Sequence, residues 1–269
     1  MNLTSDGIGK FGSTANFDVR GNIMSLLYGD NFKGQTDLKG NGTFHQLFYQ
    51  NTKILNAKNL SLPATELTVS CYDGMFAFCE NLITAPELPA TILANSCYYG
   101  MFANCTNLIS APELPSTSLG EGCYSNMFAN CTSLTIAPEL PATTLKTSCY
   151  DRMFAVCTNL VTIPNKLPAT ELTQGCYGSM FAGCTSITTA PELPATGLTQ
   201  GCYSNMFNGC TNLNYIKAMF TTTPNISYTG NWVQNVSATG TFVKNSAAEW
   251  EVTGVNSIPS GWTIETASE

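Results

Sequence analysis

Charged side chains are scarce in this sequence. Of its 269 residues only 11% are Asp, Glu, Lys or Arg, and the formal net charge is −7. Nucleic-acid binding through phosphates needs clustered lysine and arginine. An acidic chain with 11 basic residues does not supply such clusters. We therefore expect no nucleic-acid partner.

Residues typical of catalytic sites are also few. The chain has a single histidine, His45, and no Ser-His-Asp or Cys-His set can be assembled around it with support from the sequence. It contains no His-x-x-x-His pair and no EF-hand pattern. We therefore expect neither enzymatic activity nor a cofactor or bound metal.

Long apolar runs are missing as well. No stretch approaches the roughly 20 apolar residues that a transmembrane helix needs. The first residues, MNLTSDGIGKFGST, lack the charged region and the apolar core of a signal peptide. We therefore expect neither a membrane-spanning segment nor a signal peptide within this sequence.

What the sequence does contain is a repeat of about 26 residues. Its frame is Cys-Tyr-x-x-Met-Phe-x-x-Cys-x-[Asn/Ser]-Leu-x-x-Ala-Pro-Glu-Leu-Pro-Ala-Thr-x-Leu, and residues 47–67 form a degenerate copy. A fixed period of this length is typical of solenoids, in which each unit buries its apolar face against its neighbours. The regular copies begin, in steps of 26, 26, 26, 27 and 26 residues, at Cys71, Cys97, Cys123, Cys149, Cys176 and Cys202.

The spacing within one copy predicts a helix followed by a short strand. Cys97, Met101 and Cys105 lie at i, i+4 and i+8, which places them in one stripe on a helix of about two to three turns. The Leu-x-x-Ala-Pro-Glu-Leu-Pro run is expected to be extended, and its prolines restrict it to strands of about two to four residues.

The combination of Leu-x-x-[Ala/Ile]-Pro-x-Leu-Pro with Met-Phe-x-x-Cys resembles the BspA-type leucine-rich repeat of bacterial surface proteins. The resemblance implies a repeat solenoid of the α/β leucine-rich-repeat class, with short parallel strands on one side and short helices on the other. We accordingly divide the chain into an N-terminal cap (1–43), an array of one degenerate and six regular copies (44–222), and a β-rich C-terminal cap (223–269).

Twelve cysteines occupy two columns of the repeat frame. On a helix the two thiols of one copy lie ~12 Å apart, which is too far for a disulfide. Helices of successive copies would pack ~8–10 Å apart, so bridges between copies are also unfavourable. Regularly spaced columns do not converge on a zinc ion. We therefore predict buried free thiols that act as small apolar side chains.

Two sets of aromatic residues have two interpretations each. A tyrosine follows the first cysteine of every regular copy. It either packs between copies with its hydroxyl in water or forms an exposed ladder on which sugars stack. Trp232, Trp250 and Trp262 all lie in the C-terminal segment. They form either the core of the cap or a platform for glycans.

Polar residues of the extended runs form the predicted binding face. Strand alternation turns outward the residue that precedes the inward Ala or Ile. A glutamate recurs in the Pro-Glu-Leu-Pro runs, and the fourth copy has Asn165 and Lys166 instead. The lysine either relieves repulsion along the glutamate row, or the row is a strip for cations or cationic ligands. The predicted binding residues are Thr84, Glu87, Ser110, Glu113, Glu139, Thr162, Thr189 and Glu192.

The function predicted from these features is non-catalytic recognition or adhesion. The resemblance implies a bacterial protein, cell-surface or secreted, that binds a host or microbial surface protein or glycan. Two alternatives stay open: a virion component such as a phage tail or head fibre, and a structural spacer. Pairs within the frame differ between copies, as in Asp73-Gly74 and Tyr99-Gly100. A spacer does not need such differences.

Overall fold

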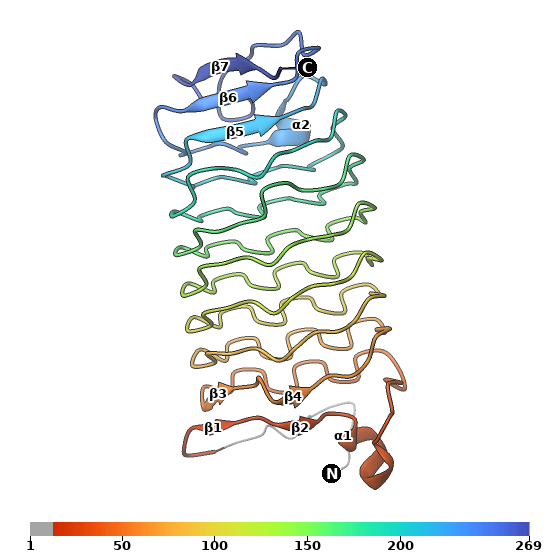
Figure 1. The fold of residues 1–269 in the computed structure, drawn as a ribbon. Helices are drawn as coiled ribbons and strands as arrows, with labels where there is room; N and C mark the ends of the chain where they lie inside the picture. Colours follow the sequence, from red (N-terminus) through yellow and green to blue (C-terminus); the bar gives the residue numbers. More distant parts are fainter. Residues whose placement is uncertain (1–12, 269) are drawn as a thin grey trace.

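A computed structural model describes residues 13–268, in which successive copies of the repeat lie one above another (Figure 1). The regular elements are short and lie near the two ends of this stack. Those near the N-terminus are β1 (Phe17–Asp18), β2 (Gly21–Asn22), α1 (Ser25–Tyr28), the 3₁₀ helix η1 (Gly29–Asn31), β3 (Ile54–Asn56) and β4 (Leu60–Ser61). Those near the C-terminus are β5 (Tyr215–Ala218), α2 (Ile226–Thr229), β6 (Thr241–Lys244) and β7 (Thr263–Thr266).

The strands of the described residues pair in parallel, as predicted, but in the regular copies before β5 the extended runs form isolated bridges instead of strands of two to four residues. β1 pairs with β3, β2 pairs with β4, and β5, β6 and β7 form a three-stranded sheet. Between these sheets, isolated parallel bridges join one copy to the next, as from Asn56 to Thr84 and from Thr84 to Ser110. The chain therefore returns to the same side of the stack once in every copy.

The helix predicted for each copy is wrong. Among the described residues the α-helices are α1 and α2, and neither lies in a regular copy. Residues 95–104 form consecutive turns instead, and every fourth residue has a positive φ: 53° at Ser96, 53° at Gly100 and 62° at Asn104. A left-handed residue at this interval is incompatible with a right-handed helix.

The hydrogen bonds of these turns alternate between the copy itself and its neighbour. Met101 N–H donates to Tyr98 O three residues back, whereas Phe102 N–H donates to Met127 O of the next copy. The same alternation recurs along the whole turn segment. The i, i+4, i+8 spacing that suggested a helix thus arises from a turn unit of four residues, whose left-handed position often holds Gly, Asn or Ser.

The aromatic residues of the frame stack in two internal columns. The tyrosine rings from Tyr72 to Tyr203 lie 5.7–6.0 Å apart, centroid to centroid, and are nearly parallel. The phenylalanine rings from Phe76 to Phe207 lie 5.6–6.0 Å apart. These tyrosines are at most 1% exposed, so the sugar-stacking ladder is wrong. The expected solvated hydroxyl is also wrong at Tyr72 and Tyr150, where it is buried without a hydrogen-bond partner.

The twelve cysteines are buried and carry free thiols, as predicted. The helical argument for free thiols does not apply, because the stacked rings show that neighbouring copies lie far closer than the ~8–10 Å of packed helices. In the second cysteine column each thiol donates a hydrogen bond to a phenylalanine carbonyl of the preceding copy, as from Cys105 to Phe76 O at 3.1 Å. The other thiols with this bond, at 3.0–3.1 Å, belong to Cys79, Cys131, Cys157, Cys184 and Cys210.

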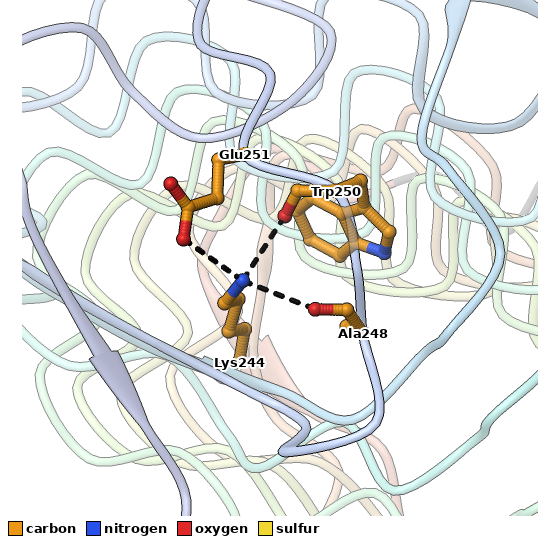
Figure 2. Close-up of polar contacts among 4 residues, drawn as sticks. All are labelled: Lys244, Ala248, Trp250 and Glu251. Atoms are coloured by element: carbon orange, nitrogen blue, oxygen red, sulfur yellow. Dashed lines mark hydrogen bonds and ion pairs between the residues drawn. The ribbon is translucent and has the colours of Figure 1, made fainter.

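At the C-terminal end of the stack, β5, β6 and β7 lie one above another and continue the extended side of the array (Figure 1). Trp232, Trp250 and Trp262 are buried there, so they belong to the core and do not form a glycan platform. Buried Lys244 of β6 donates to the carbonyls of Ala248 and Trp250 at 3.0 and 3.3 Å (Figure 2). Its ammonium also lies 3.2 Å from the Glu251 carboxylate.

At the N-terminal end, Ile23 and Met24 are buried in the continuous core, and β1 and β2 pair with the degenerate copy. The described residues leave out 1–12 of the predicted N-terminal cap and 269 of the predicted C-terminal cap. The prediction that no signal peptide is present falls mostly on these first residues.

Candidate binding groove

Six of the eight predicted binding residues line two adjoining cavities on the extended side of the stack. The first cavity, about 540 Å³, is lined by Thr84, Glu87, Ser110 and Glu113 among others. The second, about 560 Å³, is lined by Ser110, Glu113, Glu139 and Thr162 among others. Because four residues line both cavities, the two form one groove across four consecutive copies, which we call the acidic groove; the shared residues are Ser110, Ala111, Glu113 and Pro115.

The acidic groove has an apolar floor and an acidic rim. Alanines and prolines of the repeat frame line it, including Ala111 and Pro112 in the middle copy. The side chains of Glu87, Glu113 and Glu139 are exposed at its rim. Ile136 also lines it and is 57% exposed, which is high for a large apolar side chain. The groove therefore offers both negative charge and uncovered apolar surface.

The Pro-Glu-Leu-Pro backbone of the acidic groove is not hydrogen-bonded between copies, although Thr84 and Ser110 at its edge form a backbone bridge. Prolines on both sides of each glutamate-leucine pair lack an N–H donor. The carbonyls of Glu87, Glu113 and Glu139 accept no hydrogen bond within the described chain. Backbone N–H groups that likewise make none there belong to Glu87, Leu88, Glu113, Leu114, Glu139 and Leu140. The Pro-Glu-Leu-Pro runs therefore lie apart, and the two cavities occupy this gap.

Beyond the acidic groove, the glutamate row continues to Glu192, where ion pairs and backbone hydrogen bonds join neighbouring copies. Lys166 and Lys217 flank Glu192 in the row, with their Nζ atoms 3.7 and 3.1 Å from its carboxylate. The backbone pairs here as well, since Glu192 N–H donates to Asn165 O and Leu193 N–H donates to Lys217 O. Charge relief is thus the role of Lys166 at Glu192. Lys217 was missed from the sequence, although it lies one period after Glu192.

Two of the predicted binding residues therefore lie outside the acidic groove. Thr189 forms a backbone bridge with Tyr215 and is exposed. Glu192 is partly buried between its two lysines. Partly exposed ion pairs of this kind stabilise a fold by about 0–1 kcal/mol each. The sequence pattern placed all four glutamates in one row, but their environments differ because the residues one period before and after them differ.

Titratable groups elsewhere in the described chain are dispersed. Residues 13–268 contain no group of three or more His, Cys, Asp or Glu side chains arranged to hold a metal ion. The Nε2 atom of His45 lies 3.7 Å from the Asp73 carboxylate, and burial raises the pKa of Asp73. Burial also raises the pKa of the Cys71 thiol to about 12, so this thiol stays protonated at neutral pH.

In the part of the chain that the structure describes, no helix has the length and apolar character needed to cross a bilayer. No protein-family model matches the sequence, and no curated protein matches it. The resemblance to BspA-type repeats accordingly rests on the repeat frame.

Proposed function

We propose that this protein is a non-catalytic recognition or adhesion protein, built as a leucine-rich-repeat solenoid of the BspA type. It acts at a bacterial cell surface or after secretion, and it binds its partner through the acidic groove. The observation that carries this proposal is the groove itself. Exposed glutamates, apolar surface and unpaired backbone recur there in register over consecutive copies.

A surface protein suits this groove better than a glycan does. Proteins commonly hold sugars against exposed aromatic rings, but the tyrosine column and the three tryptophans are buried. Ile109 and Val161, next in sequence to the groove residues Ser110 and Thr162, are exposed, and exposed apolar side chains beside a groove favour contact with a protein. A structural spacer requires the packed core and has no use for this uncovered surface.

The test is binding to an array of bacterial and host surface proteins and glycans. A Ser110→Trp variant fills the middle of the acidic groove, since Ser110 lines both cavities. It should lose at least about tenfold in affinity for any partner that the wild-type protein binds. The matched control is Thr143→Trp, at an exposed position outside the groove, and it should bind like wild type. Equal binding by Ser110→Trp would contradict the proposal, and so would a wild-type protein that binds nothing on the array.

A further inference from the structure

We infer that the acidic groove holds an extended polypeptide segment that carries lysine or arginine side chains. The inference rests on the recognition function proposed above and names the chemistry of its partner. Three features of the groove support it: unbalanced charge, open backbone and apolar floor.

The acidic groove has more negative than positive charge, since three glutamates and one lysine, Lys58 at the edge of the first cavity, line it. Glu87, Glu113 and Glu139 occupy the same position in three consecutive copies and follow one another along the groove. Within residues 13–268 none of these carboxylates forms an ion pair. Like charges in neighbouring copies repel each other, so cationic side chains bound along the row would reduce this repulsion as well as add an attraction.

Glu192, a later member of the glutamate row, shows how a carboxylate at this position is neutralised. At Glu192 two lysine ammonium groups, from Lys166 and Lys217, approach the carboxylate from the copies before and after it. The backbone of these copies is hydrogen-bonded together. The position thus accommodates lysine side chains when they are present. The stretch from Glu87 to Glu139 differs, because Lys58 and Lys166 lie at its two ends and form no ion pair with these glutamates among the described residues.

The open backbone and the apolar floor select an extended polypeptide over a smaller cation. The free carbonyls and N–H groups of the groove can bond to a bound backbone or to side-chain donors, as in other sites that take extended peptides. The methylene stems of lysine and arginine can cover apolar surface such as Ala111, Pro112 and Ile136. A polyamine balances the charge but leaves most of two cavities of about 540 and 560 Å³ unfilled.

The test uses a fluorescein-labelled peptide of alternating lysine and valine, with Kd measured by fluorescence polarisation. Wild-type protein should bind this peptide and should not bind one in which glutamate replaces lysine. Affinity should fall as salt rises, because exposed charges are screened. A variant with Glu87→Gln, Glu113→Gln and Glu139→Gln should bind at least about tenfold more weakly. The control changes three exposed glutamates outside the groove and should stay within about twofold: Glu80→Gln, Glu121→Gln and Glu171→Gln.

A single substitution gives a second measurement. Glu113→Lys places a lysine between Glu87 and Glu139, which reproduces the alternation seen around Glu192. This variant should bind the lysine peptide at least about tenfold more weakly and should unfold at a higher temperature than wild type. Weak binding together with a lowered unfolding temperature would indicate damage to the fold and would contradict the charge argument.

Two outcomes would overturn the inference. One is unchanged peptide affinity in the triple glutamine variant. The other is displacement of the peptide by spermidine at equal charge concentration, which would mean that only the acidic row is recognised. Failure of the proposed function is separate: if Ser110→Trp loses array partners while the lysine peptide does not bind, the groove recognises another kind of partner and the proposed function stands.

Discussion

The second cysteine of each copy contributes a hydrogen bond as well as apolar volume. The thiol of Cys105 donates to Phe76 O, which also accepts the N–H of Cys79 at 3.0 Å. Burial raises the pKa of Cys105 and of Cys131 well above the usual value, so the S–H donor is retained at neutral pH. A cysteine at this point of the frame therefore fills the narrow space between copies and also donates a hydrogen bond to a buried carbonyl.

The buried thiols should make stability sensitive to alkaline pH. Burial raises the pKa of all twelve thiols, to about 12 at Cys79 and Cys123, from a usual value of 9.0. Below pH 9.0 the thiols are neutral in both states and the stability they contribute is complete. Above it the unfolded chain loses protons that the folded chain keeps, so the free energy of unfolding falls by up to ~1.4 kcal/mol per pH unit for each thiol.

The measurement is thermal unfolding with reductant present, from pH 7 to pH 11. The unfolding temperature should change little up to about pH 9 and then fall steeply. Ellman's reagent supplies the complementary test at pH 8, where native thiols should react far more slowly than thiols in denaturant. Rapid native labelling of most cysteines would show that the columns are not buried.

Among the elements, the turn segment of each copy depends on residues that tolerate a left-handed backbone. Most positive-φ positions of the turns hold Gly, Asn or Ser, as at Gly100 and Asn104. The position of Asn104 is occupied by Val156 two copies later, with φ of 62°. A β-branched residue in this conformation is strained. The fold tolerates the strain because hydrogen bonds to the next copy, such as Val156 N–H to Ala182 O, hold the turn in place.

Val156→Asn should therefore stabilise the protein. The valine is 42% exposed, so little apolar burial is lost, and asparagine adopts the left-handed conformation at lower cost. We expect a gain of about 1 kcal/mol and a rise of roughly 2–4 °C in unfolding temperature. Val161→Asn is the matched control, since Val161 is also exposed and has no positive φ. A gain of equal size in the control would refute backbone strain as the cause.

At the scale of the whole molecule, each copy contacts mainly the copies before and after it. The rings, backbone bridges and thiol bonds all join positions about one period apart. In such an array, stability is approximately a sum of contributions from single copies and from their interfaces. Internal copies are therefore expected to be dispensable one at a time, provided that the register is kept.

Removal of residues 97–122 deletes one full period of 26 residues. The stacked columns re-form across the junction, and a shorter folded protein with an unfolding temperature within a few degrees of wild type is expected. Removal of residues 97–109 deletes half a period and places every column against the wrong partners, so this chain should aggregate or unfold. Circular dichroism and size-exclusion chromatography distinguish the two. Equal damage from both deletions would contradict an array with nearest-neighbour contacts.

Much of this architecture follows from the sequence alone. The 26-residue period and the recurrence of Cys, Tyr, Met, Phe and Leu predict buried columns, because identical side chains stack when copies stack. Strand alternation predicts that Thr84 and Ser110 point outward, and repetition predicts that the glutamates form a row; both sets line the same groove. These features could be read directly because they depend on local periodicity and repetition.

The tertiary structure decided what local spacing leaves ambiguous. A four-residue spacing fits both a helix and a series of four-residue turns, and the turns form because every second N–H can bond to the neighbouring copy. The glutamate row likewise looks uniform in the sequence, but Glu192 is paired with two lysines while Glu87, Glu113 and Glu139 border an open groove. The physical reason is common to both cases: hydrogen bonds and ion pairs between copies depend on which residues stacking brings opposite each other.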